Sequence, residues 1–461
     1  MEAEEKVCTG GYVMSEVFMC APFSSRSGYG DHARSIFYAF YDSGKFNINL
    51  WDVRWGDTPK DFLDKNNKRH KLILDRILDE PTVEQQPDIY VDIRIPNEFE
   101  TFGKFNIGIT AGIETTAVSQ KWIEGCNKMD LVIVPSEHSK AGFINTIYDR
   151  VENRPDGTQV KTGEVKMEKA IEVIFEGTDK EIYKPLKVDE IDSGFLKLLN
   201  EKVPEKFAFL FLGQWCKGAY GEDRKDIFKL IKLFYETFAN LKKKPALILK
   251  TSGANFSKLD FEDCKYKIQS VKNSFPEEWD LPNVYLLHGS MSDDEINMLY
   301  NHPKIKCMVS LTHGEGFGRP LLEATMVGLP VIASKWSGHV DFLDANYSSL
   351  IEGEMVQVPK SVVWENIIIP ESKWFAVNEH DVYEKIKFAY ENEYDIKEKA
   401  KSLMRINREK FSLTKMSESF NTVFDRILKD TPTSVKLNLP KLKKVNTEQP
   451  KIKLPKLKKV K

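Results

Sequence analysis

The chain reads KCMVSLTHGEGFGRPLLEATMV at Lys306–Val327. The residues up to Leu311 are mostly apolar, as in a buried strand, and the apolar spacing from Pro320 onward is typical of a helix. The turn between them is rich in glycine. In an open parallel sheet, such a turn lies at the carboxyl end of a strand and faces the ligand crevice. This stretch therefore predicts an α/β fold with a binding site at the turn.

The helix after the turn is expected to begin with an anion site. Pro320 suits the first helical position, where its missing N–H group costs nothing. The amides of Leu321 and Leu322 would then be free, at the positive end of the helix dipole, to hold a phosphate. Gly316 and Gly318 let the backbone approach a bulky polar ligand without a Cβ clash. The turn thus favours a phosphorylated ligand.

Two carboxylates flank the turn, because Glu315 lies within it and Glu323 lies in the helix that follows. A carboxylate accepts hydrogen bonds, so the vicinal hydroxyls of a ribose or a hexose are natural partners. With a phosphate between them, the pattern indicates a ligand of the sugar–phosphate–ribose type. The alternative is a plain strand-to-helix turn in which Glu323 is a solvated helix residue.

The same alternation of strand and helix extends outward in both directions, and 461 residues are enough for two or three domains. In the first half we expect strands at Glu16–Ala21, Phe46–Val53, Asp88–Ile95, Phe105–Ile109, Leu131–Pro135 and Ala170–Phe175. In the second half we expect them at Phe207–Leu212, Ala246–Lys250, Val284–Leu287, Lys306–Leu311 and Pro330–Ser334. The fold class is therefore α/β, with two Rossmann-like doubly wound sheets facing a cleft.

The domain boundaries follow from breaks in this pattern. The expected domains are 1–190 and 207–410, with a charged linker at 191–206 and a hairpin or loop inserted at 149–168, where Asp156-Gly157 marks a turn. Helices are expected at Asp31–Tyr41, Arg224–Leu241, Pro320–Val327, Asp381–Tyr390, Ile396–Glu409 and Thr414–Lys429, with another after the capping box that starts at Ser292.

Residues 431–461 differ from the rest, because they hold ten Lys and one Glu and repeat Leu-Pro-Lys-Leu-Lys-Lys-Val. Proline and dense like charge predict a disordered tail. Since the whole chain has a net charge of −2, the other residues sum to −11. That charge argues against specific nucleic-acid binding by the folded body. The tail is read either as a tether to polyanions or a membrane surface, or as a solvated extension.

The remaining composition excludes several classes of protein. The six cysteines lie far apart without a Cys-x-x-Cys pair, which signals neither a zinc site nor a disulfide framework. The acidic start Met1–Glu5 is unlike a signal peptide, and the apolar runs are too short to cross a bilayer. We therefore expect a soluble cytoplasmic protein, peripheral at a membrane surface if the tail acts as a tether, with no metal or other cofactor.

Glu315 and Glu323 together form an E-x7-E pattern, and at this point the chain resembles the retaining glycosyltransferases of the GT-B class, family four (glycosyl transferases group one). The segments Gly328–Ser334 and Ser337–Leu343 are also similar to that family, as is Leu131–Ser136. The resemblance covers, with gaps, about 24–410. It implies an enzyme that moves a sugar from a nucleotide-diphospho-sugar donor to an acceptor hydroxyl on a glycan, lipid or protein.

The resemblance also implies roles for the turn. Glu323 would bind the ribose hydroxyls of the donor and Glu315 the hydroxyls of the transferred sugar, while the amides after Phe317 hold the sugar and the diphosphate. His313 precedes Glu315 by two residues, so it is expected to contact the sugar pocket, and the alternative is a packing or hydrogen-bonding residue. The N-terminal domain would bind the acceptor, and the last helix, 414–430, would return to pack across it.

A diphosphate requires a cation across the crevice, and Arg or Lys suits phosphate oxygens. Arg224 and Lys225, expected in the first turn of a helix, are the candidates; Lys250 is weaker. In the family an Arg directly follows the glycine of the preceding strand, but here Gln214 follows Gly213. The role is therefore assigned first to Lys225, with Arg224 as its partner. The alternative is that both are solvent-facing charges.

The N-terminal domain contributes two further candidates. Gly28 and Gly30 lie in the loop after the first strand, which in the family approaches the donor phosphate or the acceptor. Glu114 follows strand Phe105–Ile109, where family members often place a His or an acid beside the reacting carbon. No His occurs in this segment, so Glu114 is the candidate there.

The implied mechanism retains the anomeric configuration, and the acceptor hydroxyl attacks on the face of the leaving group. The leaving diphosphate itself helps to take the proton, so neither a strong protein base nor a metal is required. The alternatives are a nucleotide-sugar epimerase or a phosphorylase of the same architecture, or a non-catalytic carbohydrate- or polyanion-binding protein that uses the basic tail.

Overall fold

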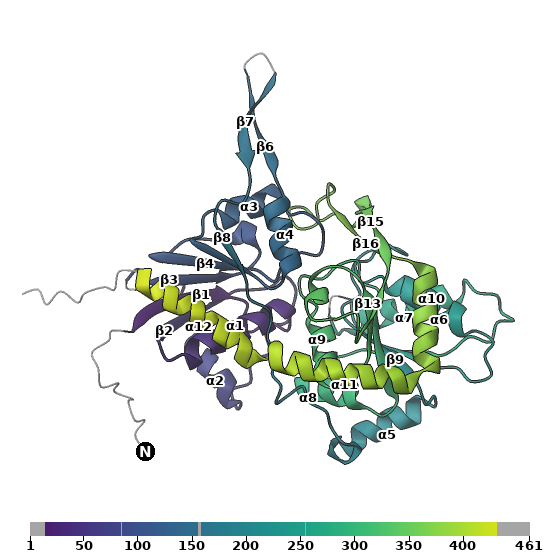
Figure 1. Ribbon diagram of the computed structural model, residues 1–461. Helices are drawn as coiled ribbons and strands as arrows, with labels where there is room; N and C mark the ends of the chain where they lie inside the picture. The colour runs from purple at the N-terminus through teal and green to yellow at the C-terminus, as the bar shows by residue number, and fades with distance from the viewer. Residues whose placement is uncertain (1–13, 84, 155–157, 254, 431–461) are drawn as a thin grey trace, which may run out of the picture.

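The computed structural model contains two α/β domains, each built on a six-stranded parallel sheet (Figure 1). It describes residues 14–83, 85–154, 158–253 and 255–430. The expected architecture of two doubly wound sheets is confirmed. The tail at 431–461 and the turn at 156–157 lie outside the described residues.

The N-terminal sheet has the strand order β2-β1-β3-β4-β5-β8. Its strands are β1 (Ser15–Ala21), β2 (Phe46–Asp52), β3 (Ile89–Ile93), β4 (Phe105–Ile109), β5 (Leu131–Val134) and β8 (Ala170–Val173). Parallel neighbours need crossover connections. Helices in these connections are α1 (Gly28–Asp42), α2 (Lys68–Leu74), α3 (Gln120–Cys126) and α4 (Glu137–Asn145), with a short 3₁₀ turn at Pro96–Glu98.

Helix α1 begins earlier than expected. Ser27 is its N-cap and its side chain accepts a hydrogen bond from the Gly30 amide at 3.1 Å. Gly28 and Gly30 therefore lie in the first helical turn rather than in a loop. A Cβ at Gly30 would lie 2.4 Å from the Ser25 carbonyl oxygen, so glycine is required for this turn to pack against the end of β1.

The C-terminal sheet has the order β11-β10-β9-β12-β13-β14. Its strands are β9 (Ala208–Leu212), β10 (Ala246–Lys250), β11 (Val284–Leu287), β12 (Ile305–Ser310), β13 (Val331–Ser334) and β14 (Ser349–Ile351). The helices in its connections are α6 (Ile227–Phe238), α7 (Lys258–Lys272), α8 (Asp293–Asn301) and α9 (Arg319–Met326), with a 3₁₀ turn at Gly338–Asp341.

Helix α6 starts after the expected position. Asp226 has φ 51, a left-handed conformation that separates the preceding loop from the helix. Arg224 and Lys225 therefore lie in the loop and not in the first turn of α6, which corrects the sequence prediction. The apolar face of α6 packs on the sheet through Ile231, Phe234 and other buried side chains.

Two antiparallel ribbons complete the domains. The insertion between β5 and β8 is a hairpin, β6 (Tyr148–Asn153) with β7 (Gln159–Val165), that projects clear of the body (Figure 1). This confirms the inserted hairpin. The second ribbon pairs β15 (Gly353–Gln357) with β16 (Lys373–Val377) and encloses a 3₁₀ turn at Lys360–Val362.

The chain passes between the domains twice, and the two passages lie side by side. The Thr178 amide donates to the Phe411 carbonyl at 3.0 Å, and the Leu413 amide donates to the Thr178 carbonyl at 2.9 Å. The segment 191–206 was expected as a linker. It follows a 3₁₀ turn at Val188–Glu190 and contains helix α5 (Ser193–Lys202). Leu199 of α5 packs in the core of the C-terminal domain.

The last three helices are α10 (Glu379–Glu391), α11 (Glu393–Lys410) and α12 (Leu413–Asp430). Helix α11 covers the C-terminal domain, and α12 returns to lie on α1 (Figure 1). The rings of Phe40 and Phe424 are 4.2 Å apart at this contact. The expected return of the last helix is therefore confirmed. Within the described residues, no helix combines the length and the apolar character that crossing a bilayer requires.

Candidate functional site

A cleft of about 550 Å³ separates the two domains and is lined by both. Its N-terminal wall comes from the start of α1, from Ala111 and Glu114 after β4, and from Glu176 after β8. The C-terminal wall comes from the loops after β9, β10, β11 and β12. The carboxyl ends of strands from both sheets thus meet at one crevice, which is where ligands bind in open α/β sheets.

The start of α9 forms the floor of this cleft, but its free amides are not the expected ones. Gly318 is the N-cap with φ 95, so Pro320 occupies the second helical position. The amides of Leu321 and Leu322 both donate to the Gly318 carbonyl, at 2.9 and 3.3 Å. The prediction that these two amides hold a phosphate is therefore wrong.

The free amides lie at residues 317–319, at the very start of the helix. Within the described parts of the chain, the amides of Phe317, Gly318 and Arg319 donate no hydrogen bond to protein. All three residues line the cleft, at the positive end of the α9 dipole. The amides of Gly318 and Arg319 belong to those after Phe317 that the resemblance implied. They can take an anion without giving up a bond inside the protein.

The turn before α9 packs directly on the N-terminal domain. A Cβ at Gly316 would lie 2.0 Å from the Ala111 carbonyl oxygen, and a Cβ at Gly314 would lie 2.0 Å from that of Glu114. The Ser136 hydroxyl donates to the Gly316 carbonyl at 2.6 Å. The glycines of the motif therefore permit contact between the two domains as well as approach by a ligand.

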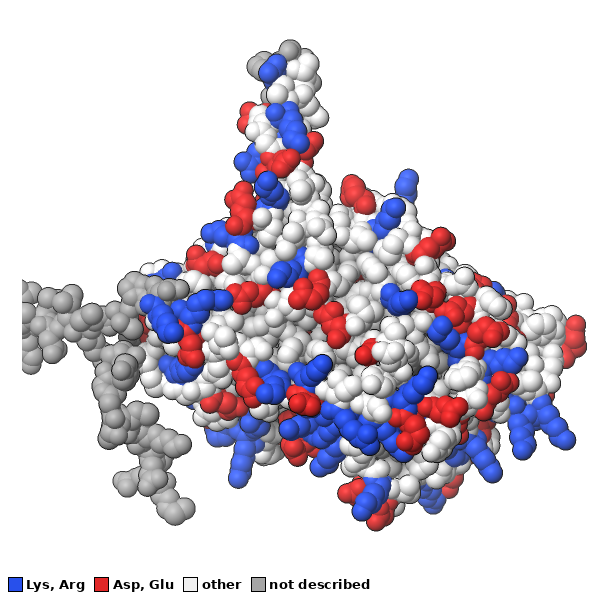
Figure 2. Space-filling view, viewed as in Figure 1, with Lys and Arg blue, Asp and Glu red and all other residues white. Residues whose placement is uncertain are grey.

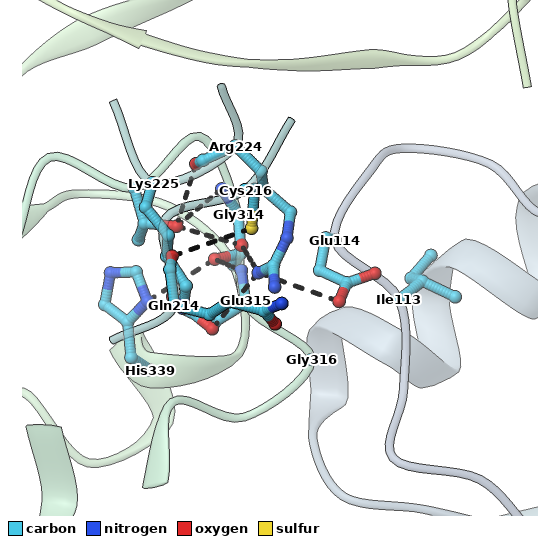
Figure 3. A network of polar contacts seen from close by, with 12 residues as sticks. Ile113, Glu114, Gln214, Cys216, Arg224, Lys225, Gly314, Glu315, Gly316 and His339 are labelled. Atoms are coloured by element: carbon cyan, nitrogen blue, oxygen red, sulfur yellow. Dashed lines mark hydrogen bonds and ion pairs between the residues drawn. The ribbon is translucent and has the colours of Figure 1, made fainter. Parts of the chain in front are cut away.

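Glu315 is held by two cations beneath the cleft (Figure 3). Lys225 Nζ bonds Glu315 Oε1, and Arg224 Nη1 lies 3.4 Å from Glu315 Oε2. Burial alone would raise the pKa of Glu315, but Lys225 and Arg224 hold it at about 2. Glu315 is therefore a fixed anion near neutral pH.

Arg224 also reaches across to the N-terminal domain, where Glu114 Oε1 lies 3.6 Å from its Nη1 (Figure 3). Arg224 lines the cleft, whereas Lys225 does not. Their side chains are 19% and 11% exposed, so neither is a solvent-facing charge. The structure thus brings Glu114, Arg224, Lys225 and Glu315 into one cluster, in which Arg224 but not Lys225 lines the cleft.

Glu323 lies one turn into α9 and is covered from the cleft by Arg319. Arg319 Nε bonds Glu323 Oε1 at 3.1 Å, and the Tyr300 hydroxyl lies 3.3 Å from Glu323 Oε2. Arg319 lines the cleft but Glu323 does not. Burial raises the pKa of Glu323 to about 8, and Arg319 opposes this only in part. Arg319 Nη1 is buried without a hydrogen-bond partner among the described residues.

Three further carboxyl groups face the cleft near Arg319. Asp31 comes from α1, Glu176 from the segment after β8 and Asp293 from the start of α8. Burial lowers the pKa of Arg319, but nearby charges, that of Asp31 most of all, raise it overall. Burial raises the pKa of Glu176 to about 7. Neither this group nor Arg319 was expected from the sequence, because the four residues come from four separate segments of the chain.

His313 does not reach the cleft. Its ring stacks on Trp374 at 4.3 Å, and its Nδ1 lies 2.6 Å from the Phe375 carbonyl oxygen. Both partners belong to β16, on the far side of the turn. His313 is buried and is not among the residues that line the cleft. The expected contact with the sugar pocket is therefore wrong, and His313 supports the turn from behind.

The loops after β10 and β11 add two apolar side chains to the cleft. Phe256 and Met291 line it, together with Lys250, whose Nζ donates to the Gly289 carbonyl at 2.6 Å. Burial lowers the pKa of Lys250. Thr251, which follows β10, presents a buried hydroxyl with no hydrogen-bond partner among the described residues. Only Lys250 of this group was expected from sequence.

On the N-terminal wall, Gly28 and Tyr29 line the cleft and Gly30 does not. The Tyr29 hydroxyl is 2.8 Å from the Thr110 hydroxyl, and the Tyr29 ring stacks on Trp55 at 4.1 Å. A Cβ at Gly28 would meet no atom within 4 Å, so this residue leaves open space at the cleft wall. Gly30 instead serves the packing of α1.

In the described part of the chain, no three His, Cys, Asp or Glu side chains gather as metal ligands. The sequence expectation that the chemistry needs no metal stays a prediction.

Comparison with known proteins finds a family similarity in the C-terminal domain. Residues 222–360 match a family model described as glycosyl transferases group 1. That segment holds Arg224, Lys225, Glu315 and Glu323. None of the curated proteins matches the sequence.

Several solved structures share the fold. The HepE protein of Anabaena in complex with UDP and glucose is 14% identical, with a TM-score of 0.57 over 89% of this chain and 100% of that chain. The sucrose-phosphate synthase of Thermosynechococcus elongatus is 10% identical, with a TM-score of 0.58 over 90% and 100%. A glycosyltransferase of Rickettsia africae is 15% identical, with a TM-score of 0.56 over 91% and 100%. The fold is therefore GT-B.

Proposed function

We propose, from the premise that residues 222–360 form a glycosyl transferases group 1 domain, that this protein transfers a hexosyl group from a nucleotide-diphospho-sugar to an acceptor hydroxyl with retention of configuration. One observation carries the proposal. The unbonded amides of Phe317–Arg319 lie in the interdomain cleft with Glu315 on one flank and the Arg319–Glu323 pair on the other. An anion site between two carboxyl groups matches a donor in which a diphosphate lies between a sugar and a ribose.

The donor is placed by matching its chemistry to the cleft. Its diphosphate lies over the three free amides, within reach of Arg224. The ribose hydroxyls bond Glu323 once Arg319 has turned toward the phosphates. The nucleotide base fits beside the loop after β10, where Phe256 offers a ring face and Thr251 offers a hydroxyl.

The transferred sugar lies beside Glu315, which accepts hydrogen bonds from its hydroxyls. Because its pKa is about 2, Glu315 stays ionised and keeps this role through the reaction. The positive charge that develops on the sugar ring during transfer is stabilised by the same carboxylate. Negative charge that develops on the leaving diphosphate is stabilised by the free amides and by Arg224, with no metal in this scheme.

The acceptor enters from the N-terminal domain. Glu114 is the carboxylate of that domain nearest to the Glu315 cluster, 3.6 Å from Arg224. It orients the acceptor hydroxyl, which attacks on the face from which the diphosphate leaves. The leaving phosphate oxygen takes the proton, so the hydroxyl needs no separate strong base.

The test is a transfer assay with purified protein, a panel of nucleotide sugars that begins with UDP-glucose, and a panel of sugar and lipid acceptors. UDP-glucose comes first because HepE is solved with UDP and glucose. We expect nucleoside diphosphate release that depends on acceptor, and a product with the anomeric configuration of the donor by NMR. Isomerised donor without acceptor would favour an epimerase instead. A protein that shows no transfer activity, and that binds polyanions only when residues 431–461 are present, would favour a non-catalytic binding protein.

A further inference from the structure

A second cavity, of about 420 Å³, lies on the C-terminal domain away from the cleft, between α11 and the start of β12. We call it the α11 pocket. Its charged lining consists of Lys306, Lys397, Lys401, Arg405 and Glu393. Lys and Arg side chains gather over this part of the surface in Figure 2, where Figure 1 places α11 and α8. The pocket is therefore strongly cationic.

The cations on α11 are aligned by helix geometry. Lys397, Lys401 and Arg405 recur every four residues, so they project from one face of the helix. Like charges at this spacing destabilise a helix. Burial lowers the pKa of Lys397, and the neighbouring Lys401 and Lys306 lower it further. The helix therefore concentrates positive charge at the mouth of the pocket.

The nearby acids neutralise only part of this charge. Glu393 is already engaged by Lys306, with 2.6 Å between Nζ and Oε1. Lys401 pairs with Glu398, an exposed residue that does not line the pocket. The guanidinium of Arg405 has no hydrogen bond or ion pair among the described residues. An unpaired guanidinium beside two ammonium groups is suited to a dianion, because Arg and Lys both bind phosphate oxygens.

The rest of the pocket is shaped for a small body attached to that dianion. Leu186, Val327 and Met404 provide an apolar wall. A volume of about 420 Å³ is within the range of small-molecule sites. A flat cationic face would suit a membrane surface, whereas a walled cavity suits a single small molecule.

One wall of the pocket is shared with the donor site. Tyr300 lines the α11 pocket, and the hydroxyl at the end of its ring lies 3.3 Å from Glu323 Oε2 and 3.2 Å from the Pro320 carbonyl oxygen. Tyr300 is 2% exposed, so it has no room to move without its neighbours. A ligand seated against this ring acts on Glu323 through one side chain.

From this geometry we propose that the α11 pocket binds a phosphomonoester of about sugar-phosphate size, and that occupancy changes the affinity of the cleft for nucleotide through Tyr300. Arg405 and Lys401 hold the phosphate and Lys397 closes its inner side. The coupling is reciprocal, so nucleotide changes the affinity of the pocket by the same factor.

The site is tested by calorimetric titration of glucose 6-phosphate, and of inorganic phosphate alone, into the full-length protein at low salt. We expect saturable binding to one site that weakens at least tenfold in the double variant Lys401→Glu/Arg405→Glu. The matched control is Lys399→Glu, which reverses an exposed charge on the same helix outside the pocket. The absence of binding, or an equal loss in the control, would overturn the proposal.

Two further measurements, of vesicle binding and of thermal unfolding, complete the test. Vesicles that contain phosphatidic acid carry the same phosphomonoester on a lipid; binding to them but not to glucose 6-phosphate would contradict a small-molecule site. The thermal midpoint of each variant shows whether it remains folded. A variant that is unfolded is replaced by Arg405→Ala, which must also weaken the binding.

The coupling is tested by titrating UDP with and without saturating glucose 6-phosphate. This arm rests on the proposed nucleotide site, whereas the glucose 6-phosphate titration does not, so the two can fail separately. Tyr300→Phe keeps the ring but removes the hydroxyl that contacts Glu323. We expect it to bind glucose 6-phosphate normally and to lose the shift in UDP affinity. A shift that persists in Tyr300→Phe, or no shift in the wild type, would overturn the coupling.

Discussion

Glu315 and Glu323 lie in the same wall of the cleft, and their neighbours give them opposite ionisation. Two cations hold the pKa of Glu315 at about 2 after opposing burial, whereas burial raises that of Glu323 to about 8 with a single Arg in opposition. Pairs of carboxyl groups with separated pKa values often mark functional sites, where the two groups have different roles. Here one is a permanent anion, and the other is an uncharged or masked group until a ligand arrives.

The role of Glu315 is tested by Glu315→Gln. The amide keeps the size of the side chain but removes the charge that faces the sugar ring in the transition state. We expect turnover to fall about 100-fold, the usual cost of losing one electrostatic contact of this kind. Nucleoside diphosphate affinity, measured in the same preparation, should change by less than about tenfold. Unaltered turnover in a folded variant would contradict the role.

The raised pKa of Glu323 makes a prediction about stability. Because its folded-state pKa exceeds the ordinary value of about 4.3, the stabilising contribution of the protonated form is complete below that value. It is lost as pH rises through about 8. The wild type should therefore lose thermal stability relative to Glu323→Gln between about pH 4.3 and 8. Parallel melting curves for the two proteins across this window would show that Glu323 titrates normally.

Arg319 should link recognition of phosphate to recognition of ribose. It bonds Glu323 and lines the cleft, so a phosphorylated ligand in the cleft offers it a stronger partner than a ligand without phosphate. In Arg319→Ala we expect the dissociation constant for UDP to rise about tenfold, while that for uridine falls. Arg319→Lys should restore part of the UDP affinity. The exposed Arg150→Ala is the control. Uridine and UDP affinities that fall together would contradict this role.

At the scale of the element, helix α12 joins the last segment of the chain to the N-terminal domain. Phe424 is fully buried and its ring lies 4.2 Å from that of Phe40 in α1. Phe424→Ala should lower the free energy of unfolding by about 3–5 kcal/mol, the usual cost of removing a buried aromatic ring. The measurement is denaturant unfolding. Thr422→Ala, on the exposed side of α12, should cost far less, and equal losses would mean that α12 does not pack as described.

The elements that could be predicted from sequence are those with local signals. Gly314–Gly318 and the apolar spacing after Pro320 were sufficient to locate the turn and α9. The starts of α1 and α6 were not predicted, because they depend on the Ser27 cap and on the left-handed Asp226. The amides of Leu321 and Leu322 were expected to be free for the same reason, since the position of the first helical residue decides which amides are bonded.

At the scale of the whole molecule, the site is assembled by contact between domains, and this part could not be predicted. Asp31, Glu176 and Asp293 come close to Arg319 only after both sheets have formed and faced each other. The direction of the His313 side chain was also not predicted. Glu315, two residues further on, lines the cleft, whereas the His313 ring stacks on Trp374 behind the turn. Sequence spacing alone did not show the direction in which either side chain points.

The central claim is that the cleft holds a nucleoside diphosphate at the start of α9 between the two domains. The most direct measurement is a crystal structure of the protein grown with UDP. We expect the diphosphate oxygens about 3 Å from the amides of Phe317, Gly318 and Arg319, with Arg319 displaced from Glu323 and the ribose hydroxyls in its place. A diphosphate bound elsewhere, or a cleft with the Arg319–Glu323 pair intact beside bound UDP, would contradict the account.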